Sequence, residues 1–581
     1  MFRLLIENEE VELNSNGVIT LNKLILDLED FSLRGINFTN TLTLPITSKN
    51  NRLTGYPSHL SSANDSFEIR KEYTLFNNST IISKGNVILK SYDEKEGIKI
   101  QLAEGSDFWN VAGSKLLYDL RLEEDDFEFS NTNMNDRKVK TSSVFLTALH
   151  SATNSSSGTA LQNYNATRPC YLWINVLNKL IAQLGYTVDY TNVLERTDLN
   201  NLGCLSNCEK FFVSDYKRRF VNVVETTGVI DYTGATDVFT KTGNVSESGG
   251  VLTNARYETS YVIKGYVNSA IRTELRLQVN GDTEIVIIPK GRSFINFKTD
   301  ELEIGENFII NFDDPVTLED VYVYSAINED DIFSEDNSLS VSGFLVLADY
   351  NLPQQTQKQF IKNIITLNFL DFTIDENTKN ITFKYVPDVI NTNNSIDFSG
   401  KVERYFTIER GDIYGQLSIF KYQNDEFLNK NRGAAFINIR DENAPNVKEI
   451  IHIKEYSASR EIQVSNNNML LVDIYTTGDN TRKSVRDRIC LFKEEGTFGF
   501  NASFTSIGWQ RLYAKHYVDF IQATRRERLI SFSAYLTNLD YRSLQKNPVI
   551  YIDFLQSTFL VTEIEGFQRN EKCKIKCIKY N

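Results

Sequence analysis

A short amphipathic helix followed by a strand occurs twice in this chain, and this order constrains the fold more than any other feature. The second copy lies in residues 360–408, where a helix precedes a strand at 372–375, a polar turn and another strand. The unit ends in the sequence SIDFSGK at residues 395–401. Apolar residues at three- and four-residue steps indicate its helix, namely Phe360, Ile361, Ile364, Ile365 and Leu367.

The first copy is predicted over residues 169–190. Pro169 stands near the start of the expected helix at 169–184, and Gly185 directly follows its end, as start and stop signals require. A strand at 185–190 follows, so helix and strand recur in the same order. We interpret this recurrence as a weak internal duplication, and coincidence between two common αβ units is the alternative.

The composition predicts an α+β protein that is predominantly β. At 581 residues the chain is too long for one hydrophobic core, so roughly two to four domains are expected. Aromatic residues make up 12% of the chain and only 9 residues are proline, which favours packed strands over long disordered segments. Alternating residues at 38–45 and a hairpin at 87–102 predict a barrel or sandwich near the N-terminus.

A polar stretch rich in Gly and Ser at residues 240–250 is typical of a linker. Six short apolar runs follow between residues 261 and 324, and Asn280-Gly281 between two of them is a strong hairpin signal. These runs predict an inserted β-sandwich. Nearer the C-terminus the pattern predicts a helix at 510–524 and strands at 529–536, 549–554, 559–564 and 573–578.

No catalytic, nucleotide-binding or metal-binding motif occurs in the sequence, so no catalytic, cofactor-binding or metal-ligating residue is assigned. The histidines are far apart in sequence, and each is interpreted as structural or on the surface: His59, His150, His452 and His516. The cysteines could hold zinc, but buried thiols are preferred, and disulfides are not expected without export. They are Cys170, Cys204, Cys208, Cys490, Cys573 and Cys577.

The chain is acidic, with a net charge of −14 and a pI near 5.1. Binding to DNA irrespective of sequence depends on basic residues, so this chain is a poor candidate for it. The acidic runs at 123–126 and 329–331 are interpreted as solvated loops, and the basic run at 525–528 as a helix end. Neither a transmembrane run nor a signal peptide is predicted, so we expect the chain to stay in the cytoplasm in which it is made.

Four parts of the sequence resemble phage tail hub proteins, as found in tailed phages of Bacteroidetes-type hosts. One is residues 360–401, where Phe398 stands in a position that is often Trp in the family. Another is FTNTLTLPITSKNNRL at residues 38–53. The others are RICLF at 488–492 and the closing helix with Tyr513, Tyr517 and Ile521, followed by a strand unit at 529–539.

The resemblance implies two related tube-forming β-barrels with packed helices and a sandwich inserted between them. The expected division is a first barrel at 1–165, a helix–strand unit and linker at 166–245, the insert at 246–332, a second barrel region at 333–505 and closing elements at 506–581. Three copies would form a ring that joins the tail tube to the tail tip. Phage DNA would pass through the ring without specific binding.

The expected protein is thus a structural virion component with no enzymatic activity, assembled in the host cytoplasm. Its partners would be two further copies of itself, tail tube or adaptor proteins, and tail-tip or fibre proteins. A carbohydrate-binding adhesion protein is the alternative, in which the insert binds a host glycan through exposed aromatic residues. A cell-wall hydrolase with paired carboxylates has lower weight.

Overall fold

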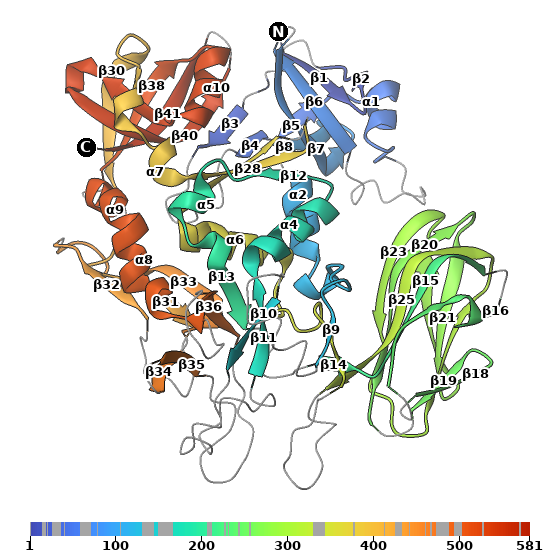
Figure 1. Ribbon diagram of the computed structural model, residues 1–581. Helices are drawn as coiled ribbons and strands as arrows, with labels where there is room; N and C mark the ends of the chain where they lie inside the picture. The colour runs from blue at the N-terminus through green and yellow to red at the C-terminus, as the bar shows by residue number, and fades with distance from the viewer. Residues whose placement is uncertain are drawn as a thin grey trace.

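The fold is known from a computed structural model, in which strands predominate and helices pack between the sheets (Figure 1). The prediction of an α+β, predominantly β protein is confirmed. The structure describes residues 2–580 apart from 14–18, 20, 26–35, 40, 59–70, 78–79, 105, 130–143, 149–166, 206–211, 226–227, 231, 242–244, 255–256, 329–342, 376–377, 412, 424–432, 441, 459, 465–466, 472–486, 493–501, 526–527 and 569–570.

Both ends of the chain contribute to one 14-stranded sheet, called the joined sheet below. Its two halves meet where β3 pairs antiparallel with β40. The N-terminal half contains β1 (Phe2–Ile6), β2 (Glu9–Glu10), β3 (Leu21–Leu24), β4 (Ile36–Thr39), β5 (Leu42–Leu44), β6 (Lys71–Asn77), β7 (Thr80–Asp93) and β8 (Gly97–Glu104). The C-terminal half contains β29 (Ile396–Asp397), β30 (Val402–Arg410), β38 (Arg528–Tyr535), β39 (Val549–Ile552), β40 (Ser557–Phe567) and β41 (Lys572–Lys579).

Each half of the joined sheet carries a strand followed by a threonine-capped helix. After β5, the Thr47 side chain accepts a hydrogen bond from the backbone N–H of Asn50 and begins α1 (Ser48–Leu53). After β38, Thr537 accepts one from the N–H of Asp540 and begins α10 (Asn538–Lys546). The two halves therefore share a local design.

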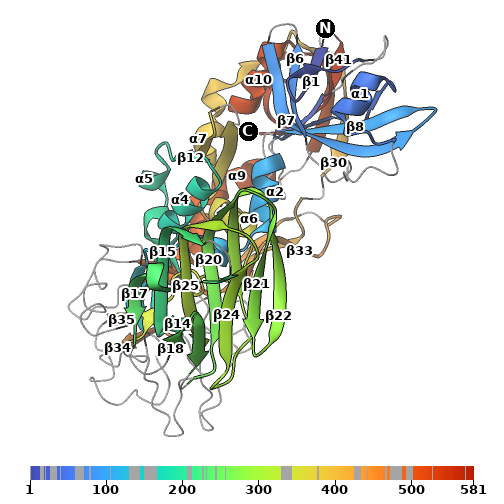
Figure 2. The same ribbon diagram turned by 90° about the vertical axis from the view of Figure 1, so that its right-hand side faces the viewer.

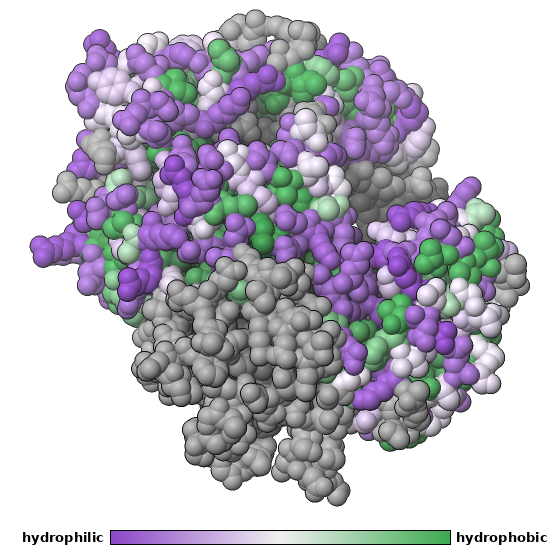
Figure 3. All heavy atoms as spheres, in the orientation of Figure 1, coloured by the Kyte–Doolittle hydropathy of each residue, from purple (hydrophilic) through white to green (hydrophobic). Residues whose placement is uncertain are grey.

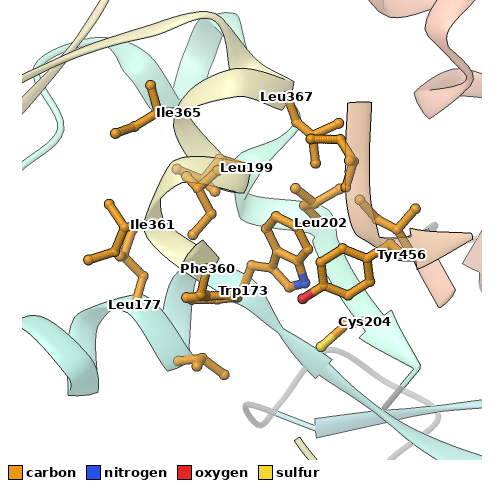
Figure 4. Packing of buried hydrophobic residues seen from close by; sticks show 14 of the residues in the cluster. Trp173, Leu177, Leu199, Leu202, Cys204, Phe360, Ile361, Ile365, Leu367 and Tyr456 are labelled. Carbon is orange, nitrogen blue, oxygen red and sulfur yellow. The ribbon is translucent and has the colours of Figure 1, made fainter. Parts of the chain in front are cut away.

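The two predicted helix–strand units pack together between the sheets. Helices α4 (Trp173–Gln183) and α6 (Gln357–Asn368) meet where Trp173 contacts Phe360, with ring centroids 5.2 Å apart (Figure 4). Their strands form one small sheet of β12 (Thr187–Asp189), β27 (Leu370–Asp375) and β28 (Asn380–Tyr385). The predicted start of the first helix is wrong, because Pro169 lies in strand β11 (Thr167–Leu172) and pairs with Leu146.

An eight-stranded central sheet takes strands from both sides of the insert. The C-terminal helix packs on it, with α8 (Trp509–Leu512) and α9 (Val518–Thr524) joined by a π-helical turn at Tyr513–Tyr517. The strands of the sheet are β10 (Val144–Ala148), β11 (Thr167–Leu172), β13 (Leu202–Leu205), β31 (Leu417–Gln423), β32 (Ala435–Asn438), β33 (Val447–Ser457), β36 (Arg488–Phe492) and β37 (Ala502–Ser503).

The inserted sandwich projects from one flank of the molecule and has its own core (Figures 1 and 2). One of its sheets contains β15 (Tyr216–Glu225), β17 (Thr236–Thr240), β20 (Ser260–Ser269), β23 (Gly291–Lys298) and β25 (Val316–Asn328). The other contains β16 (Gly228–Val229), β18 (Val245–Ser248), β19 (Val251–Asn254), β21 (Thr273–Val279), β22 (Asp282–Ile288) and β24 (Asn307–Phe312).

Two predictions about the insert have opposite outcomes. The Asn280-Gly281 hairpin is confirmed, since both residues have positive φ and join β21 to β22. The linker at residues 240–250 is wrong, because β18 lies in this range and pairs with β19. The sandwich begins earlier than predicted, with β15 pairing along β25.

Candidate assembly interface

The joined sheet ends at β30, and among the described residues this strand pairs only with β38. Phe406 lies opposite Phe532, and Ile408 lies opposite Ile530. The β38 residues are buried, whereas their β30 partners are exposed. The apolar face of the core therefore continues onto an edge strand and stops there, which is an arrangement suited to pairing with another chain.

A bulge in β30 presents an aromatic residue beside this edge. The register against β38 shifts between Val402 and Phe406, so the intervening residues have no partner in the ladder. Bulges bend the strand and redirect side chains. Tyr405 lies in the bulge and its side chain is 88% exposed. Exposed tyrosines are frequent anchors of protein–protein interfaces, so the edge combines free backbone groups with an aromatic anchor.

The SIDFSGK segment attaches the beginning of β30 to the sheet. The backbone N–H of Phe398 donates to the carbonyl of Tyr551 at 2.9 Å, and its side chain is buried. The Asp397 carboxylate accepts from the backbone N–H of Ser399 at 2.8 Å, and the hydrogen bonds from Ser399 lower the pKa of Asp397. Lys401 forms an ion pair with Asp540 of α10. The segment thus fixes where the edge strand starts.

A second charged site joins the insert to the rest of the protein. Lys264 on β20 is fully buried, and its Nζ donates to Asp349 Oδ2 at 2.5 Å. The same ammonium group donates to the carbonyl oxygens of Leu120 at 2.5 Å and Tyr118 at 2.9 Å. The hydroxyl of Tyr324 also donates to Asp349, at 3.1 Å. This buried lysine thus joins the insert to segments that precede and follow it in the sequence.

Lys217 on β15 forms a second buried pair beside the first. Its Nζ lies 2.6 Å from Asp126 Oδ2. Burial raises the pKa of Asp126 to about 7, with the charge of Asp349 adding to the rise and Lys217 opposing it. Around these pairs, Arg121 and Arg219 both bind Asp320 of β25. The insert is therefore docked through its charged sheet face.

The acidic run at 123–126 is solvated only in part: Glu124 is exposed as predicted, whereas the prediction is wrong for Glu123 and Asp126. Glu123 and Asp126 are nearly fully buried against the insert, because the two lysines compensate their charge. The sequence does not single out Lys264 and Lys217, which join the insert to the rest of the protein. One signal in the sequence could have indicated a buried charge, namely that Lys264 is the single charged residue in the apolar run at 261–267. The run at 329–331 lies outside the described residues.

The predicted structural histidines and thiols are only partly covered by the structure. His516 is buried and lies 3.1 Å from the Tyr385 hydroxyl, and burial lowers its pKa to about 4. His452 binds Gln423 at the surface of the central sheet. Cysteines 170, 204, 490, 573 and 577 are buried free thiols, as predicted. His59, His150 and Cys208 lie outside the described residues.

The described residues bring together no group of three or more His, Cys, Asp or Glu side chains that could hold a metal ion. Among the helices in the described ranges, none is long and apolar enough to cross a bilayer. The basic run lies at a helix end only through Arg525, which directly follows α9, because Arg528 begins strand β38; residues 526 and 527 lie outside the described residues.

No protein-family model matches the chain, and no curated protein matches it significantly in sequence. Among solved structures the chain is similar to the 43 kDa tail protein of prophage MuSo2 from Shewanella oneidensis, at 7% identity over 99% of this chain and 97% of that chain, with a TM-score of 0.33. It is also similar to the tail protein from Neisseria meningitidis MC58, at 11% identity over 58% and 96%, with a TM-score of 0.20.

A third similar structure is GITRL from bushbaby, at 15% identity over 21% of this chain and 98% of that chain, with a TM-score of 0.16. Two of these three structures are named tail proteins, one of them from a prophage. Every TM-score is below 0.5, so none of these similarities assigns a role to this chain.

Proposed function

We propose that this chain is a structural protein of a phage tail, and specifically a hub subunit. Three copies form a ring that joins the tail tube to the tail tip and surrounds the DNA channel. The observation that carries the proposal is the joined sheet, which contains strands from both ends of the chain and stops at the apolar edge of β30. The resemblance of four sequence segments to hub proteins supports it.

The physical reason is that sheets with open edges are stabilised by closure. A head-to-tail contact repeats around a rotation axis and forms a ring when the rotation closes. In such a ring the β30 edge of each copy meets the opposite flank of the joined sheet in the next copy. Every edge is then covered, which also removes the risk of open-ended aggregation.

The acidic balance fits a channel that DNA crosses without binding. With a net charge of −14, carboxylates facing the channel would repel the phosphate backbone. The repulsion extends only about one Debye length, about 8 Å at physiological salt, so only residues on the channel wall contribute. The protein would act without catalytic turnover, with tail tube or adaptor and tip or fibre proteins as partners, after assembly in the host cytoplasm.

No observation favours the alternatives. Glycan binding by the insert calls for exposed aromatic residues, but the large exposed apolar residues in the described part of the insert are Val and Ile. A hydrolase calls for an accessible carboxylate pair with a raised pKa. The carboxylate with a raised pKa between the insert and the rest of the protein is that of Asp126, whose side chain is nearly fully buried and paired with Lys217.

The proposal is tested by the mass and symmetry of the purified protein. Light scattering should give the mass of three 66.6 kDa subunits, and negative-stain images should show a threefold ring with an open channel. The double variant Tyr405→Lys, Ile408→Lys places positive charge on the β30 edge. It should raise the protein concentration at which half of the rings dissociate by at least about tenfold. Ile304→Lys, an exposed position on the insert, is the control. A stable monomer at high concentration contradicts the proposal.

A further inference from the structure

A second open edge lies on the same flank of the molecule as β30. The central sheet ends at β32, and in the described part of the chain this strand pairs only with β31. Figure 1 shows β30 and β32 on one side, with the inserted sandwich on the other. In a head-to-tail ring, the flank with β32 therefore faces the insert of the neighbouring copy.

The outer face of the central sheet is apolar next to this edge. Phe436 on β32 lies opposite Ile419 on β31, and Val447 on β33 lies opposite Leu417 on β31. Phe436 and Val447 are exposed, and the two β31 residues are partly exposed. The four side chains form one patch across three neighbouring strands. A patch of this kind beside an unpaired edge is a site for a partner strand.

The insert presents a matching edge on the opposite flank. Strand β22 is the last strand of its sheet and, within the described residues, pairs only with β21. Ile285 and Ile287 project from the same face of β22, and each is about half exposed. Figure 2 shows β22 at the border of the insert, and Figure 3 shows apolar residues gathered on this domain.

Exposed charges of both signs lie beside the two edges. Asp282 and Glu284 lie on β22, and Lys290 follows this strand closely. Arg440 and Glu442 follow β32 closely, and Glu449 on the same flank is paired with Lys421. The two flanks thus share apolar residues beside free backbone groups, with Arg440 as a counter-charge for the acidic residues of β22.

We propose that β22 of one copy pairs edge to edge with β32 of the next copy, with Ile285 and Ile287 against the patch around Phe436. This inference rests on the proposed ring, and it assigns to the insert a role in holding neighbouring subunits together. It gives each pair of copies a second contact, far from the contact made by β30.

The test uses the full chain with cysteines introduced at two positions. Ile287→Cys and Phe436→Cys proteins are mixed under a small-molecule disulfide oxidant and separated without reductant. We expect a crosslinked species of two chains that contains both variants and is absent from either variant alone and from the unmodified protein. In parallel, the double variant Ile285→Lys, Ile287→Lys should raise the protein concentration at which half of the rings dissociate about tenfold. Val224→Lys, exposed on the other sheet of the insert, should leave it unchanged.

The outcomes separate this inference from the ring itself. If rings form but no mixed crosslink appears and the lysine variant assembles normally, the β22–β32 contact is overturned while the hub proposal stands. If the unmodified protein is monomeric and the mixture stays uncrosslinked, both are overturned. If the crosslink forms and the lysine variant dissociates, the contact is supported.

Discussion

Replacing Lys264 by methionine should selectively loosen the insert from the rest of the protein. The substitution keeps an unbranched side chain that is one atom shorter, but it leaves the Asp349 carboxylate buried with hydrogen bonds only from Tyr324 and its neighbour Tyr350. It also removes the donor to the carbonyl oxygens of Tyr118 and Leu120. Breaking one partner of a buried ion pair costs about 3–5 kcal/mol.

The loss of stability should depend on how deeply the ion pair is buried, and an exposed pair in the same protein provides the comparison. Lys515 and Asp198 form a pair at 2.8 Å that is substantially exposed, so Lys515→Met should cost less than about 1 kcal/mol. The double variant Lys264→Met, Asp349→Leu removes both charges of this pair. It should be more stable than Lys264→Met alone, because no Asp349 carboxylate is left buried without its cation, while Glu123 keeps Arg121 as a partner.

Native-state hydrogen exchange is the suitable assay, since a protein of several domains has no single free energy of unfolding. The opening free energy of amides in β20 and β25 should fall by about 3–5 kcal/mol in Lys264→Met, while amides in β40 and β41 should change little. A loss below about 1 kcal/mol in β20, or a double variant that is no better than the single one, would refute the reasoning.

Three predictions concern single residues. His516 has a pKa of about 4 in the folded protein and about 6.5 in the unfolded chain, so the free energy of unfolding should fall by up to about 3 kcal/mol as pH drops from 6.5 to 4. His516→Phe should flatten the dependence of the melting temperature on pH in this range. The Asp126 pKa of about 7 implies the opposite slope, a loss of stability as pH rises from about 4 to 7, which Asp126→Asn should remove. An unchanged slope contradicts either prediction. Gly250→Ala should destabilise the insert by about 1–3 kcal/mol, since its Cβ would lie 2.3 Å from Val229 Cγ1, whereas Gly249→Ala meets no neighbour and should cost less; equal thermal shifts of the two would contradict this.

Local elements follow from the sequence because their causes lie within a few residues. The apolar stripe beginning at Phe360 specifies α6, and Asn280-Gly281 specifies the turn between β21 and β22. The hairpin of β7 and β8 and the closing strands also follow from alternation and turn residues. Pro169 misleads because a proline is tolerated near the beginning of a strand as well as at the beginning of a helix.

Only the tertiary structure decided which of these elements meet. The pairing of β3 with β40 joins residues more than five hundred positions apart, and no local pattern encodes such a register. The sequence does not show whether Lys264 is solvated or buried. It can be buried because Asp349, distant in sequence, lies beside its ammonium group and compensates the charge. Tyr405 is exposed because a bulge and the end of a sheet leave it without a neighbour, a consequence of strand order rather than of its own sequence.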